Sequence, residues 1–115
     1  MKKGNIVLIK YPFTDLTSTK VRPAIVVSSN GFTNRGQDAI FVCISSRTIN
    51  TQPSDLVFSV SDPEFPNSGL KKSSLIKVGK IICLSKLLTS RLLGEVGPNT
   101  MAKIREKLID ILDLN

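Results

Sequence analysis

A chain of 115 residues is long enough to bury a core and fits one domain, and its formal charge of +7 indicates a basic protein. It contains no histidine, which excludes histidine-based acid–base catalysis and a typical zinc site, and its nine carboxylates are scattered. We therefore expect neither a metal nor another cofactor. No apolar run approaches the ~20 residues that cross a bilayer. The apolar run at residues 6–9 is too short for a signal peptide, so we expect a cytoplasmic protein with no membrane partner.

The first half of the chain alternates apolar runs with polar segments. Runs rich in β-branched residues predict three strands, at residues 5–11, 21–29 and 39–44. Pro23 belongs at the start of the second strand, because proline cannot donate a ladder hydrogen bond. The hydroxyl-rich segment 14–20 is predicted to be a loop, and the Asn- and Gly-rich segment 30–37 a mobile loop.

The second half continues the β pattern with shorter runs. Four further strands are predicted, at residues 56–60, 74–78, 80–84 and 91–96. Gly79 separates two of them, and Gly94 predicts a bulge in the last. Residues 62–69, with two prolines, are predicted to form a loop, and residues 85–88 one helical turn.

The hydrophobic period changes after Gly97. Asn99 is a favourable N-cap, and apolar residues from Met101 to Leu112 recur at helical spacing, which predicts a helix over about residues 100–113. Short strands followed by one helix indicate a mainly β fold, with the whole chain 1–115 as a single domain. We predict a small closed barrel, because closure removes exposed strand edges.

Two cysteines fall within predicted strands. Cys43 and Cys83 lie far apart in apolar runs. Without a secretory signal, this pattern predicts two buried thiols and not a disulfide.

The positive charge is concentrated in the predicted β body. Between Glu64 and Glu95 there is no acidic residue, whereas the basic residues there are Lys71, Lys72, Lys77, Lys80, Lys86 and Arg91. The predicted helix is nearly balanced in charge. This distribution favours an anionic partner, with nucleic acid first and an acidic protein second. A solvated basic surface without a partner is the alternative.

Hydroxyl groups and cations occur together at three predicted strand ends. The sets are Thr17, Ser18, Thr19, Lys20 and Arg22, then Ser45, Ser46, Arg47 and Thr48, then Lys71, Lys72, Ser73, Ser74 and Lys77. Phosphate offers only acceptors and negative charge, so these groups suit it, and they favour phosphodiester binding more strongly than cleavage. Arg22, where a polar loop meets a strand, is the foremost candidate. Capping the barrel edge, or pairing with Asp15, is the alternative explanation for Arg22.

Several of these segments together resemble the MazF/PemK toxin family. They are GNIV at residues 4–7, YPFT at 11–14, VRPAIVV at 21–27, FVCISS at 41–46, NSGLKKSS at 67–74 and LGEV at 93–96. The resemblance covers nearly the whole chain, and the arginine–proline strand entry is its most specific part. It implies an SH3-like β-barrel and a homodimer.

The resemblance also implies a function. Such toxins are metal-independent, sequence-selective endoribonucleases that cleave single-stranded mRNA and are neutralised by a cognate antitoxin. The ribose 2′-OH attacks the adjacent phosphorus and the 5′-oxygen leaves, giving a 2′,3′-cyclic phosphate and a 5′-OH end. Cleavage of this kind requires no cofactor.

Site residues follow from the same resemblance. Arg22 matches the family's catalytic arginine, Ser45 stands where a catalytic threonine is common, and Ser18 corresponds loosely to a first-loop serine. Asn5 stands where an acidic residue is common. We expect RNA binding by Thr17, Thr19, Lys20, Ser46, Arg47, Lys71, Lys72 and Lys77.

Two other functions fit a small basic barrel. A DNA gyrase poison resembling CcdB would inhibit the topoisomerase and leave RNA intact, but it needs neither the Arg22-Pro23 entry nor the hydroxyl of Ser45. A non-catalytic RNA-binding barrel would bind RNA in a salt-sensitive way without turnover.

Overall fold

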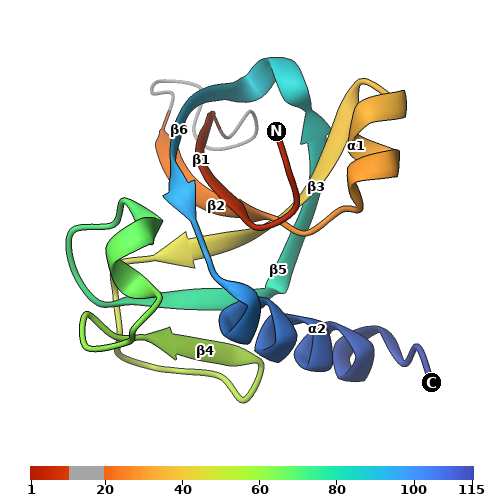
Figure 1. Ribbon diagram of the computed structural model, residues 1–115. Helices are drawn as coiled ribbons and strands as arrows, with labels where there is room; N and C mark the ends of the chain where they lie inside the picture. Colours follow the sequence, from red (N-terminus) through yellow and green to blue (C-terminus); the bar gives the residue numbers. More distant parts are fainter. Residues whose placement is uncertain (11–19) are drawn as a thin grey trace.

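A six-stranded antiparallel sheet organises the fold in this computed structural model, which describes residues 1–10 and 20–115 (Figure 1). The strand order is β4-β5-β3-β2-β1-β6. The strands are β1 (Asn5–Lys10), β2 (Val21–Val26), β3 (Asp38–Ser45), β4 (Asp55–Phe58), β5 (Ser74–Ser85) and β6 (Thr89–Glu95). The mainly β class predicted from the sequence is confirmed.

The two strands predicted on either side of Gly79 are one strand, β5. The pairing of β3 with β5 shifts between Val42, which faces Ile81, and Cys43, which faces Lys77. Residues 78–80 therefore bulge from the ladder, and a bulge bends its strand. In Figure 1, β5 runs from the lower part of the sheet beside β4 to the upper part beside α1.

The sheet carries one hydrophobic core on each face. On the face that we call the helix face, Ile25, Val42 and Ile76 pack with Phe65 and Ile104. On the other, which we call the second face, the core residues are Val7, Ile9, Ala24, Val26, Ala39, Phe41 and Leu84. Successive residues of a strand point to opposite faces, so the continuous apolar runs of β2 and β3 supply both cores.

The prediction of a closed barrel is wrong. β4 and β6 stand at the two ends of the strand order and do not pair with each other. Two helical segments cover the helix face instead, and they are α2 (Pro98–Leu112) and the 3₁₀ turn η1 (Phe65–Ser68). Because these segments bury the core side chains, the sheet does not need to close.

The predicted mobile loop at residues 30–37 contains a short helix, α1 (Asn30–Arg35). The Ser29 hydroxyl caps it by accepting a hydrogen bond from the Phe32 N–H at 3.1 Å. Thr33 is buried, and its hydroxyl lies 2.7 Å from that of Ser28. A cap and a buried anchor outweigh the turn preference of Asn and Gly.

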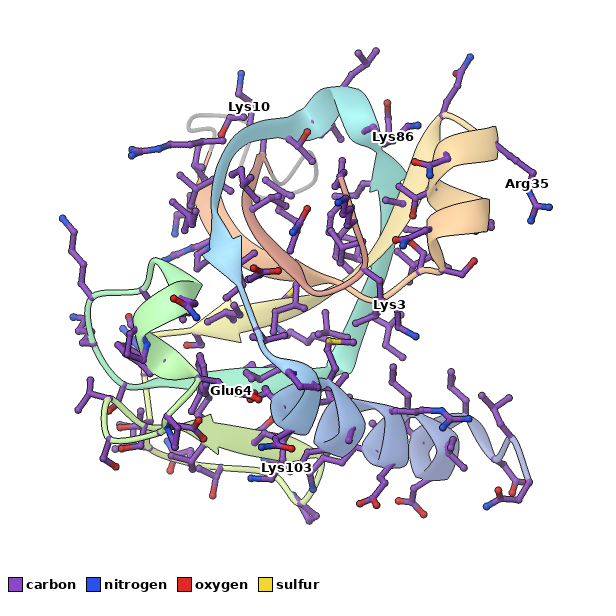
Figure 2. The ribbon with its side chains drawn as sticks, in the orientation of Figure 1. Lys3, Lys10, Arg35, Glu64, Lys86 and Lys103 are labelled. Atoms are coloured by element: carbon purple, nitrogen blue, oxygen red, sulfur yellow. The ribbon has the colours of Figure 1, made fainter. Side chains whose placement is uncertain are left out.

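Helix α2 starts two residues earlier than predicted, with Gly97 and not Asn99 as the N-cap. Its free amides are satisfied from a distant part of the chain. The Glu64 carboxylate accepts hydrogen bonds from the N–H groups of Asn99 (2.9 Å) and Thr100 (2.8 Å). Figure 2 shows Glu64 against the first turn of α2. A side chain at position 97 would overlap Glu64, which explains the glycine.

Glu64 also makes the attachment of α2 dependent on pH. Burial by itself would raise the pKa of Glu64, but hydrogen bonds from Thr100, Asn99 and Gly97 outweigh it and lower the pKa below the ordinary 4.5. A lowered folded-state pKa stabilises the fold above the unfolded-state pKa. That stabilisation is lost as the pH falls through the folded-state pKa.

We therefore expect Glu64→Gln to lower the free energy of unfolding by about 1 kcal/mol at pH 7, the stability that a helix N-cap usually contributes. Below pH 4.5 the difference between variant and unmodified protein should shrink. Urea unfolding at several pH values measures it. Glu106→Gln, on the exposed side of α2, is the matched control and should change little. An equal loss in the two variants would contradict the capping role.

Of the remaining sequence predictions, some are confirmed and one is wrong. The helical turn predicted at residues 85–88 is confirmed as η2 (Lys86–Leu88). Cys43 is buried as predicted, but Cys83 is exposed. Cys83 points away from the second core, into which its neighbours Ile82 and Leu84 pack. Among the described residues, no helix is long and apolar enough to span a membrane.

Candidate nucleic-acid interface

Arg22 and Ser45 lie at the same end of neighbouring strands. β2 and β3 are antiparallel, with Ala24 opposite Cys43 and Ile25 opposite Val42. Continuing this register by two residues places Arg22 opposite Ser45. Residues opposite each other in an antiparallel pair project from the same face, so both side chains belong to the second face. The paired part of this ladder ends at Ala24 and Cys43, so strand pairing directs Arg22 and Ser45, 23 positions apart in the sequence, to the same end of the sheet.

The Arg22 and Ser45 side chains differ in how much of each is exposed to solvent. Arg22 is exposed, and Ser45 is half-buried. The Ser45 hydroxyl accepts a hydrogen bond from the Arg47 N–H at 3.1 Å, which fixes the turn after β3. Because a hydroxyl has one donor and two acceptor sites, Ser45 keeps its proton for a ligand oxygen.

Further predicted residues surround this pair. Lys20 directly precedes β2, and Ser46 and Arg47 directly follow β3, and all three are exposed. Ser45 pairs with Leu75 near the start of β5, so the exposed Lys71 and Lys72 precede β5 at the same sheet end. The end of the sheet defined by Lys20, Arg22, Ser45, Ser46, Arg47, Lys71 and Lys72 is called the cationic end below.

The third hydroxyl set has structural roles in part. The Ser73 hydroxyl accepts a hydrogen bond from the Val60 N–H at 2.9 Å, and that of Ser74 donates to the Lys72 carbonyl at 3.0 Å. These bonds hold the segment before β5 in place. Lys71 and Lys72 of the same segment are exposed to solvent.

Three predicted residues, Thr17, Ser18 and Thr19, lie outside the described residues. One basic residue was missed by the sequence analysis. Lys10 ends β1 opposite Val21, next to the start of β2, and it is exposed (Figure 2). The signal for it was the antiparallel pairing of the first two strands, which places the end of one beside the start of the next.

Within residues 1–10 and 20–115, the cationic end is an exposed surface and not a closed pocket. A hollow of about 300 Å³ lies between α2 and residues 52–54, but neither Arg22 nor Ser45 lines it. A hollow of that size suits a small ligand, whereas an open row of guanidinium, ammonium and hydroxyl groups suits a phosphodiester chain. The fold and surface therefore define a small, basic, antiparallel β domain suited to a nucleic-acid backbone.

Comparison with known proteins agrees with this class. Residues 2–112 match the family described as PemK-like, MazF-like toxin of type II toxin-antitoxin system. The chain belongs to this family. A search of curated proteins returned no match.

Solved structures share the fold over nearly the full chain. An endoribonuclease in complex with its cognate antitoxin from Mycobacterial species has a TM-score of 0.78 and 23% identity, covering 100% of this chain and 97% of its own. An endoribonuclease from Mycobacterial species has a TM-score of 0.73 and 26% identity, with coverages of 98% and 91%. MazF from Deinococcus radiodurans has a TM-score of 0.77 and 18% identity, with coverages of 98% and 96%.

Proposed function

We propose that this chain is the endoribonuclease toxin of a type II toxin–antitoxin system and cleaves single-stranded RNA at selected sequences without a metal ion. The observation that supports this proposal most directly is the β2–β3 register, which directs Arg22 and Ser45 to the same end of the sheet. Family membership and the 26%-identical endoribonuclease support the same activity.

The proposed reaction is an internal transesterification. The ribose 2′-oxygen forms a bond to the adjacent phosphorus as the 2′-OH loses its proton. The bond from phosphorus to the 5′-oxygen breaks, and that oxygen gains a proton. The products are a 2′,3′-cyclic phosphate and a 5′-OH end.

Each of the two described side chains has a role in this reaction. The Arg22 guanidinium stabilises the extra negative charge on the phosphorus oxygens through paired hydrogen bonds. A guanidinium offers several N–H donors and no acceptor, so it suits charge stabilisation better than proton transfer. The Ser45 hydroxyl donates a hydrogen bond to a non-bridging oxygen or to the 2′-oxygen. Ser18 is the third proposed catalytic residue, on the family resemblance alone.

The cationic end binds the RNA backbone in this proposal. The chain has one Tyr, five Phe and no Trp, so few aromatic rings are available for stacking bases. Base selection would therefore rest mainly on hydrogen bonds to splayed single-stranded bases. Lys20, Ser46, Arg47, Lys71 and Lys72, with Thr17 and Thr19, are the proposed backbone contacts.

We further propose a cognate antitoxin, a homodimeric toxin and a cytoplasmic location. The relative with a TM-score of 0.78 was solved with its antitoxin, which supports the first of these. An acidic or amphipathic antitoxin segment would complement the cationic end.

The test is incubation of the purified protein with a long single-stranded RNA in EDTA. We expect discrete cuts at a recurring motif, with 5′-OH and 2′,3′-cyclic phosphate ends identified by enzymatic end-labelling. Loss of cleavage in EDTA, or 5′-phosphate ends, would contradict the mechanism. If RNAs of varied sequence all stay intact while DNA gyrase is inhibited, the protein is a poison of the CcdB type.

A further inference from the structure

We propose that Asp55 is a positioning residue that holds the Lys77 ammonium group on the β4 side of β5, one strand away from Ser45, where it binds the RNA phosphate next to the one being cleaved. The inference rests on the proposed ribonuclease function and adds a residue that no sequence motif indicated. Its basis is a row of paired residues that crosses β4, β5 and β3.

Strand pairing places Lys77 on the same face as the catalytic pair. Lys77 lies opposite Cys43 on β3, and Ser45 is two residues further along that strand. Ile76 and Val78, on either side of Lys77, both pack into the core of the helix face. Lys77 therefore projects from the second face, as a diagonal neighbour of Ser45. Diagonal neighbours lie about 7–8 Å apart, within reach of a long side chain.

Asp55 holds Lys77 from the other side. The two residues are directly opposite each other on β4 and β5, and the Lys77 Nζ lies 3.6 Å from the Asp55 Oδ2. The Asp55 side chain is 4% exposed, whereas that of Lys77 is 27% exposed. Lys77 thus keeps contact with solvent, and with any RNA there, while its partner is buried.

The Asp55 carboxylate is itself fixed in place. Its Oδ2 accepts a hydrogen bond from the Gln52 N–H at 2.8 Å, and the Asp55 N–H donates to the Gln52 carbonyl at 2.9 Å. An immobile carboxylate restricts a flexible lysine and lowers the entropy lost when the lysine binds a phosphate. A carboxylate this buried is poorly placed to bind RNA itself.

The proposal predicts an effect opposite to simple electrostatics. Removing a negative charge near a polyanion should strengthen its binding. If Asp55 positions Lys77, Asp55→Asn should instead weaken RNA binding while the Gln52 N–H keeps its acceptor. The sign of the effect therefore separates positioning from a general effect of charge.

The experiment is a double-mutant cycle with Asp55→Asn and Lys77→Met in the full-length protein. Binding of a fluorescent RNA that carries the cleaved motif, with 2′-deoxyribose at the cut, is measured against salt concentration. We expect Lys77→Met to weaken binding about tenfold and lower the salt slope by about one counterion. Asp55→Asn should weaken binding about threefold alone, and should not weaken it in the Lys77→Met background.

Cleavage of all-ribose RNA provides an independent readout. Both changes should raise KM and leave kcat nearly unchanged, because the bound phosphate is not the reacting one. Asp38→Asn, exposed at the start of β3 opposite Ser85, is the matched control for loss of one negative charge. It should not weaken binding. Unfolding temperatures of all variants report any purely structural effect.

Tighter RNA binding by Asp55→Asn alone would show that Asp55 competes for Lys77, and the inference would be wrong. Equal effects of Asp55→Asn in the two backgrounds would also overturn it. If the proposed ribonuclease function itself were wrong, the unmodified protein would neither bind nor cleave the RNA, and this result is distinct from the two above.

Discussion

Arg22→Ala is expected to reduce kcat for RNA cleavage by about 100- to 1,000-fold, the usual cost of removing a donor that stabilises transition-state charge. Arg22 is exposed at the start of β2, so the unfolding temperature should stay within a degree or two. Single-turnover kinetics at saturating protein, with thermal unfolding in parallel, measure the two quantities. The loss should appear in kcat more than in KM.

Two further variants test whether the loss depends on the shape and the position of the Arg22 guanidinium group. Arg22→Lys keeps the charge but loses the planar fork that makes two hydrogen bonds, so only part of the activity should return. Arg105→Ala, exposed on α2, removes the same charge away from the cationic end and should cleave normally. Normal cleavage by Arg22→Ala would exclude Arg22 from the site.

Gly94→Ala is expected to cause a large loss of stability, about 3 kcal/mol or more. A Cβ at this position would overlap the Asn67 carbonyl and the backbone of Ser68, where η1 packs against β6. Backbone atoms cannot move aside as a side-chain tip can. Urea unfolding, or a fall in expression of folded protein, measures the loss.

Gly36→Ala is the matched control. The nearest atom to a Cβ there is the Phe32 carbonyl oxygen at 3.8 Å, and φ is −122°, which any residue adopts. Its stability should be unchanged or slightly raised, because alanine restricts the unfolded chain. If the two variants were equally stable, close contact between η1 and β6 would not be what requires Gly94.

Several parts of the fold follow from local sequence. Alternating and continuous apolar runs located the strands, because burial on one or two faces imposes those patterns. Pro23 marked the entry of β2, and the change of period after Gly97 located α2. The residues at the cationic end were identified individually, since a guanidinium or hydroxyl beside a strand end is visible in the sequence.

Contacts between distant residues decided the rest. Glu64 caps a helix that begins more than 30 residues later, so Asn99 was mistaken for the cap. The sheet stays open because α2 and η1 bury the helix face, a fact no single strand encodes. The alignment of Arg22 with Ser45, and of Asp55 with Lys77, depends on strand register. Register is set by the packing of both cores together, and therefore only the tertiary structure could show which side chains share a sheet end or form an ion pair.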